Sequence, residues 1–181
     1  SNWEGGSVPT STVNVSIPVG CTNWPVIDVN PANCQDLSIA SGAHLSCSAN
    51  NTLNIYGNWT VSGTGYFDAT AGTVVFMKTG TQSLTMTTNA NDHFYNLTTG
   101  DGVIANTVNL GSTLDINGAL SITANSTLDA TASYYNIEIA GDWSNSGTFN
   151  EQQGTETFDG SGVQSLTGET FYNLAINNSA A

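Results

Sequence analysis

The sequence predicts an all-β protein, and within that class a right-handed parallel β-helix (a β-solenoid) with turns of about 20–23 residues. Three observations predict it. Short runs of alternating apolar and polar residues recur along the chain, one stretch of sequence is repeated, and no segment carries a sustained helical stripe of apolar residues. A β-sandwich is the alternative fold, because it also consists of many short strands punctuated by turn residues.

The composition indicates a single, strongly acidic domain. The chain has 181 residues and carries fourteen carboxylates against one basic side chain, Lys78, which gives a net charge of −13. Nucleic acid and anionic membranes both need a basic surface, so this charge excludes nucleic-acid binding and disfavours adsorption to membranes. No run of about 18 apolar residues occurs, so we expect no membrane insertion.

Residues 53–102 resemble residues 137–180, which indicates a duplicated segment. The best match aligns LNIYGNW, which starts at Leu53, with IEIAGDW, which starts at Ile137. A third copy, LDINGAL, starts at Leu114 and has leucine where the other two have tryptophan. The step from the third copy to the second equals one turn of the predicted length, and we interpret the longer step from the first copy to the third as three turns.

The alternation within this motif predicts which side chains enter the core. Nine apolar positions should point inward: Leu53, Ile55, Trp59, Leu114, Ile116, Leu120, Ile137, Ile139 and Trp143. The glycines between them, Gly57, Gly118 and Gly141, should permit a bend between two faces of the coil. A carbohydrate-stacking surface is the alternative role for the tryptophans, but leucine at the equivalent position favours the core.

The domain organisation follows from this pattern. Residues 1–18 are interpreted as a leader plus a first strand that could join subunits, and residues 19–181 as one solenoid domain. The last stretch, FYNLAINNSAA, stops partway through a repeat, and neither end carries an amphipathic cap. We therefore expect open strand edges at both ends of the coil.

Three cysteines occur at equal spacing, and none forms a C-x-x-C pair, which argues against a zinc or redox motif. An odd number in an exported protein predicts one disulfide and one leftover thiol. Cys47 overlays an inward isoleucine of the repeat and should be a buried thiol. We therefore expect a Cys21–Cys34 disulfide, with Cys21–Cys47 as the alternative.

The chain also contains six N-x-S/T sequons, which favour an exported protein and are candidate glycosylation sites. They begin at Asn14, Asn50, Asn58, Asn96, Asn125 and Asn177.

Several motifs together resemble repeats of secreted bacterial surface proteins. These are G-x-W-x-x-S-G-T-F, G-T-x-x-F, G-x-x-Q-x-L-T and F-Y-N-L-x-I-N-N, preceded by W-x-G-G and by V-x-I-P-x-G-C-x-N-x-P-V-I-D. Proteins with such repeats are right-handed parallel β-helices similar to filamentous-haemagglutinin-like adhesins. The resemblance covers nearly the whole chain and implies an extracellular, cell-surface location, but it brings no catalytic residues with it.

Candidate catalytic and metal-binding residues are few. A glycosidase needs two close carboxylates, and the candidates Asp115, Asp129, Glu138 and Asp142 are interpreted as scattered outward polar residues.

Candidate metal-binding residues are equally few. The pair His44-x-x-Cys47 would suit a metal, yet the alternation places these two side chains on opposite faces. Calcium is the one cofactor that the sequence admits, on the loop carboxylates Asp68, Asp92 and Asp101. We therefore predict no enzyme and no dedicated cofactor site.

The leading functional hypothesis is a non-enzymatic extracellular structural protein whose subunits associate head to tail into a surface filament or matrix. Open strand edges at both ends would supply the contacts, and the partner would be the protein itself. The alternative is an adhesin or glycan-binding stalk domain of a larger surface protein, whose partners would be surface glycans.

Overall fold

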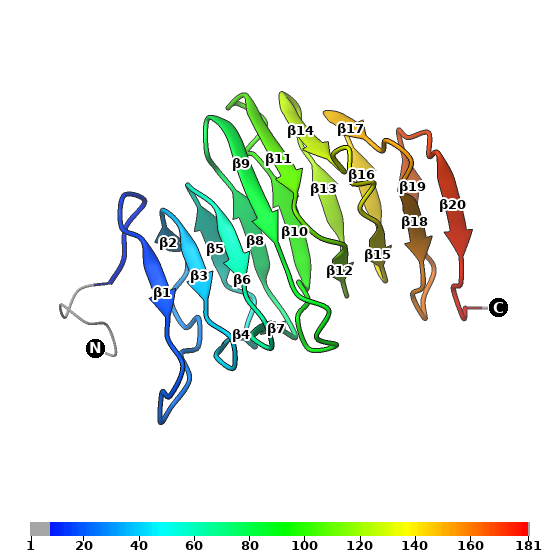
Figure 1. Ribbon diagram of the computed structural model, residues 1–181. Helices are drawn as coiled ribbons and strands as arrows, with labels where there is room; N and C mark the ends of the chain where they lie inside the picture. Colours follow the sequence, from blue (N-terminus) through cyan, green and yellow to red (C-terminus); the bar gives the residue numbers. More distant parts are fainter. Residues whose placement is uncertain (1–7, 181) are drawn as a thin grey trace.

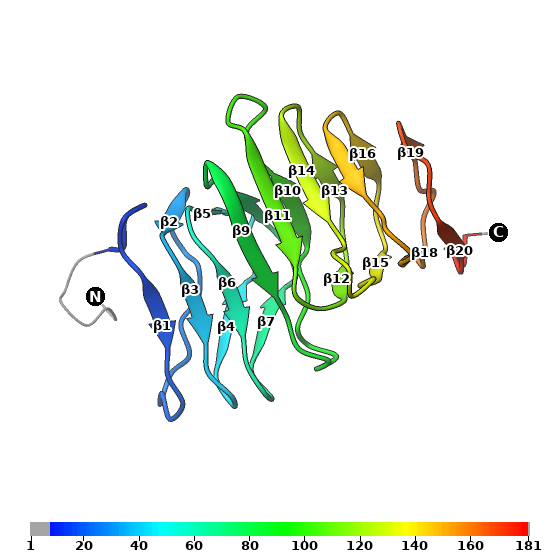
Figure 2. The same cartoon turned by 45° about the horizontal axis from the view of Figure 1, so that its top comes forward.

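The computed structural model describes residues 8–180, which form an all-β parallel solenoid of about seven turns (Figure 1). Residues 1–7 of the expected leader lie outside the described residues. Figures 1 and 2 show the strands wound around one axis, with β1 at one end and β20 at the other. Within the described part of the chain no helix is long and apolar enough to span a membrane.

Three faces surround the core, and the chain visits them in a fixed order, first, second, third. The first face is a seven-stranded sheet of β1 (Val15–Ile17), β3 (Leu37–Ile39), β6 (Trp59–Val61), β9 (Gly80–Thr85), β11 (Asn106–Leu110), β14 (Ser126–Asp129) and β17 (Thr148–Asn150). The third face is also seven-stranded, with β2 (Ala32–Cys34), β5 (Thr52–Ile55), β8 (Thr73–Phe76), β10 (Asn96–Thr99), β13 (Leu120–Ile122), β16 (Trp143–Asn145) and β19 (Leu166–Thr167).

The second face is assembled from two sheets. A two-stranded sheet contains β4 (His44–Cys47) and β7 (Tyr66–Ala69), and a four-stranded sheet contains β12 (Leu114–Ile116), β15 (Ile137–Ile139), β18 (Thr155–Phe158) and β20 (Asn173–Ile176). Isolated parallel bridges from Asp68 to His93 and from Phe94 to Ile116 connect the two sheets. The second face therefore also continues along the solenoid.

Successive turns pair in parallel and place inward residues on inward residues. One inward column on the third face runs from Leu53 to Val74 and then to Leu97, Leu120 and Trp143. The sequence separation of register partners varies along the solenoid: it is short where β18 pairs with β20 and long where β9 pairs with β11. The length of a turn therefore varies over a wider range than the predicted one of about 20–23 residues, because loops of different length are accommodated outside the strands.

The nine apolar positions of the repeated motif all lie in this core, with exposed fractions between 0 and 6%. Trp59 and Trp143 are 0% and 1% exposed, so neither offers a ring face to a sugar. Leu120 pairs directly with Trp143, as the alignment of the second and third copies predicts.

The first copy, in contrast, lies on different faces, and the interpretation of the step from Leu53 to Leu114 as three turns was wrong. The residue three turns above Leu53 is Leu120, and not Leu114. As a result the first copy runs from the third face to the first, in β5 and β6, whereas the second runs from the second face to the third, in β15 and β16. The duplicated segments are thus related by a shift of one face around the axis.

This shift preserves the packing of the aromatic residues. Trp59 contacts Phe67 and Phe94, each with a distance of 5.0 Å between ring centroids. Trp143 contacts Phe149 at 4.9 Å and Phe171 at 5.3 Å, and these two phenylalanines are the sequence equivalents of Phe67 and Phe94. Because the three faces offer equivalent surroundings, the same motif builds the same cluster on a different pair of faces.

The corner glycines allow successive turns to approach closely. A Cβ atom at Gly141 would lie 2.3 Å from the carbonyl oxygen of Gly118, directly below it in the stack. A Cβ atom at Gly118 would lie 2.5 Å from the carbonyl oxygen of Tyr95, and one at Gly57 would lie 2.9 Å from the backbone nitrogen of Asp36. The predicted bend does occur at these corners, but glycine is required there by contact with the neighbouring turn.

Substitution of a corner glycine should therefore destabilise the solenoid. We expect Gly141→Ala to lower the free energy of unfolding in urea by about 1–3 kcal/mol, because the added methyl group meets backbone atoms that cannot move aside. Gly162→Ala is the matched control, since a Cβ atom there has no neighbour within 4 Å, and it should change stability by less than about 0.5 kcal/mol. Equal effects of the two substitutions would contradict this role for the corner.

Candidate functional site

The predicted Cys21–Cys34 disulfide is not formed, and all three cysteines are thiols. Cys34 lies in β2 and points inward, paired with Ile55 of the next turn and 2% exposed. Cys21 follows β1 and its thiol donates a hydrogen bond to the carbonyl of Pro18. Cys47 is also inward and 4% exposed. The alignment of Ala32-Asn33-Cys34 with Leu53-Asn54-Ile55 is the sequence signal that indicates an inward Cys34.

The environments of the two inward thiols oppose ionisation. Burial raises the pKa of the Cys34 thiol to about 12, with a further increase from the nearby Asp36 carboxylate. Burial also raises the pKa of Cys47, against hydrogen bonding with the backbone of Ala49 and Asn51, which lowers it. Since the thiolate is the reactive form, neither side chain is suited to nucleophilic or redox chemistry.

Several of the sequon asparagines have a structural role at the corners. The side-chain oxygen of Asn14 accepts a hydrogen bond from the backbone N–H of Asp36, at 3.1 Å. The Asp36 carboxylate accepts from the N–H of Asn58 at 2.6 Å, and the Asn58 side chain accepts from Ser83 at 3.0 Å. This ladder of side-chain acceptors satisfies N–H groups where the chain turns between faces. Glycosylation of the six sequons stays a prediction, and Asn50 and Asn177 are among the exposed ones.

The four carboxylates considered for glycosidase chemistry occupy three different places. Asp115 and Glu138 are register partners on the outside of the second face. Asp129 ends β14 and accepts a hydrogen bond from Asn150, and Asp142 accepts one from the N–H of Ser165 at 2.8 Å. The pKa of Asp115 is raised, first by burial and then by the carboxylates around it, against the lowering effect of His93.

The residues considered for metal binding do not gather into one site: Asp68 lies 3.6 Å from His93, and Asp101 accepts hydrogen bonds from the N–H groups of its own loop. His44 points outward and stacks on Tyr66, with 4.8 Å between ring centroids, whereas Cys47 points into the core. Asp92 is 2% exposed and fixes a loop, because its carboxylate accepts hydrogen bonds from the N–H groups of Phe67 and Thr87. Among residues 8–180 no three His, Cys, Asp or Glu side chains gather in a way that could hold a metal ion.

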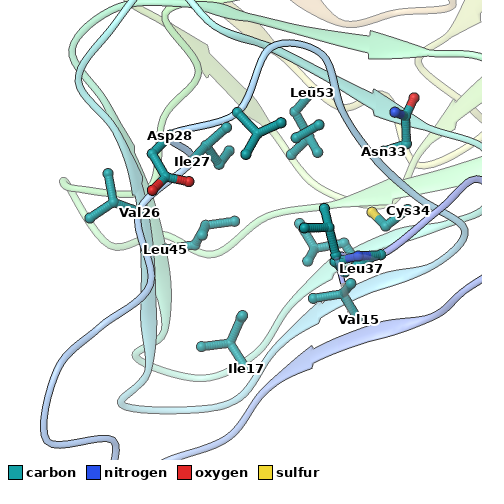
Figure 3. A pocket seen from close by; sticks show the side chains of 14 residues that line it. Val15, Ile17, Val26, Ile27, Asp28, Asn33, Cys34, Leu37, Leu45 and Leu53 are labelled. Carbon is teal, nitrogen blue, oxygen red and sulfur yellow. The ribbon is translucent and has the colours of Figure 1, made fainter. Parts of the chain in front are cut away.

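The two ends of the solenoid are the most distinctive surfaces. At the N-terminal end the core opens into an apolar hollow, in which Val15, Ile17, Leu37, Leu45 and Leu53 gather (Figure 3). The hollow is bordered by β1 and β2, which are the terminal strands of the first and third faces.

At the C-terminal end, apolar side chains of the last turn lack a covering turn. Leu166 stacks on Trp143, Leu174 on Glu156 and Ile176 on Phe158. The residues below are between 0 and 1% exposed, whereas the three above are 40, 48 and 61% exposed in that order. The strands β17, β19 and β20 are the terminal strands of their sheets and leave backbone hydrogen-bonding groups unpaired on one side.

Exposed apolar residues are concentrated at these two ends. Of thirteen large hydrophobic residues that are exposed within the described part of the chain, ten lie in the segments 8–29 and 163–176. The remaining three, Tyr95, Val103 and Tyr134, lie along the sides. An isolated exposed side chain needs no explanation, but two groups at opposite ends of an elongated molecule identify candidate interfaces.

Comparisons with protein-family models, with curated proteins and with solved structures give no match to this sequence. The adhesin-like resemblance is therefore supported only at the level of the solenoid fold.

Thiol labelling tests the assignment of the cysteines. We expect one equivalent of a maleimide to react in the native protein, at the partly exposed Cys21, and three equivalents to react after unfolding in urea, because Cys34 and Cys47 are buried. Peptide mass spectrometry would identify the labelled residue. A Cys21–Cys34 disulfide would appear instead as a single reactive thiol in the unfolded, unreduced protein, and would contradict the structure.

Proposed function

We propose that the protein is a non-enzymatic structural subunit that associates head to tail through its two apolar ends and builds an extracellular filament or matrix at the cell surface. The observation that carries the proposal is the last turn, where Leu166, Leu174 and Ile176 stack on buried residues but are themselves 40–61% exposed. One further turn would cover them, and a second copy can supply it.

The energetics favour contact at the ends over contact along the sides. Burying a half-exposed leucine or isoleucine contributes about 1 kcal/mol, and strand edges add main-chain hydrogen bonds. The strands of the interior turns carry outward carboxylates such as Asp68, Asp115 and Glu138, so lateral contact between copies brings like charges together. The two ends differ from each other, which makes the contact heterologous and allows it to propagate into a filament.

The alternative is an adhesin or glycan-binding stalk domain of a larger surface protein. In that case further turns of a longer chain would cover the same side chains. The two proposals differ in one property: only the structural subunit associates with itself as an isolated chain. The extracellular location is supported by the sequons and the acidic composition.

End-specific substitutions test the proposal. We expect wild-type protein to form species that grow with concentration in sedimentation velocity, and we expect Ile176→Asp and Val26→Asp each to remain monomeric, because each places a charge in one end. Val103→Asp is the matched control: Val103 is 79% exposed on the side of the solenoid, so this variant should associate like the wild type.

Mixing the two end variants distinguishes a heterologous contact from a symmetric one. An Ile176→Asp subunit keeps an intact N-terminal end, and a Val26→Asp subunit keeps an intact C-terminal end. The mixture should therefore form dimers and nothing larger. A wild-type protein that stays monomeric at every accessible concentration would exclude the structural-subunit proposal and favour the stalk domain.

A further inference from the structure

Glu156 occupies a core position near the C-terminal end of the solenoid. It lies in β18 between Thr155 and Thr157 and stacks between Ile137 of β15 and Leu174 of β20. Its exposed fraction is 0%, so the side chain points into the core and not to solvent.

The carboxyl group has no hydrogen-bond partner for either oxygen atom. In the first copy of the duplicated segment the equivalent residue is Val74, which is 2% exposed and fits an apolar column. Glu156 thus places an ionisable group at a core position that the first copy fills with valine. A buried carboxylate without a partner is far more costly than the neutral acid.

The charged groups near Glu156 reinforce this preference. Glu151 and Glu169 are the neighbouring charges, and both are acidic. The adjacent β15 carries only the outward Glu138, the adjacent β20 carries no titratable residue, and no basic side chain occurs in residues 137–176. Burial first, and then the Glu151 carboxylate, raise the pKa of Glu156 to about 7 from its ordinary value of 4.5, with Glu169 adding to the shift.

We propose that Glu156 controls the closure of the C-terminal turns by its protonation: β18 to β20 pack onto the solenoid when its carboxyl group is neutral and open when it ionises. The position of the residue makes the effect local, because β20 pairs only with β18 and no turn covers it within residues 8–180. Opening breaks the pairing of β18 with β15 and of β19 with β16, together with the contacts of Phe158 and Phe171 to Trp143, and leaves the earlier turns stacked. This inference does not rest on the proposed assembly.

The sign of the pH dependence follows from the raised pKa. The closed state binds the proton more tightly than the open state, so closure is most stable below pH 4.5 and weakens as the pH rises through about 7. Between these two values the opening equilibrium constant should increase about tenfold per pH unit, about 300-fold in total. Above pH 7 both states are ionised and the constant should level off.

Hydrogen exchange of the β20 amides, measured on dilute monomer and corrected for the intrinsic rate at each pH, tests this directly. Wild-type protein should show the tenfold dependence, while Glu156→Gln and Glu156→Val should show none and remain protected at pH 8. The valine variant restores the residue of the first copy, and the amides of β3 are the internal control. A wild-type profile that is flat, or that both variants reproduce, would overturn the proposal.

Discussion

The structure depends on one constraint: the backbone of each strand can pair only with the strands one turn before and one turn after it. Parallel pairing in register places each inward residue on the inward residue of the turn below. Apolar residues therefore form continuous columns, such as the one from Leu53 to Trp143. The same constraint determines the corners. Gly141 lies directly over Gly118, where no Cβ atom fits between the turns. Asn14 and Asp36 provide side-chain acceptors for backbone N–H groups where the chain turns between faces, and Asn58 does the same one turn further on.

The constraint also makes the ends of the stack different from its interior. An interior turn buries its inward residues between two neighbours, whereas the last turn leaves Leu174 and Ile176 half exposed over buried partners. Glu156 lies one turn below this open end, so the least covered part of the solenoid also contains its only fully buried and unpartnered carboxyl group among residues 8–180. Association and local opening would therefore act on the same few strands.

Much of the fold could be predicted from the sequence, because alternation identifies inward residues without reference to the face they lie on. For the same reason the sequence could not place the first copy: the motif from Leu53 to Trp59 fits any of three equivalent corners, and loop lengths shift it by one face. The inward positions of Cys34 and Glu156 could be predicted from the sequence, because Cys34 aligns with Ile55 and Glu156 aligns with Val74. The odd number of cysteines predicted a disulfide instead, and that prediction is wrong because Cys34 lies in the core as a free thiol. How far the apolar side chains at the two ends are exposed could not be predicted from the sequence, because their exposure depends on whether another turn covers them.

Electron cryomicroscopy of the purified protein at mildly acidic pH, where Glu156 is neutral and β18 to β20 are closed, tests the central claim most directly. The account predicts thin, unbranched fibres in which the strand spacing of about 4.8 Å continues across subunit boundaries, with β17, β19 and β20 of one subunit facing β1 and β2 of the next. Dispersed single solenoids at high concentration, or fibres joined through their acidic sides, would contradict it.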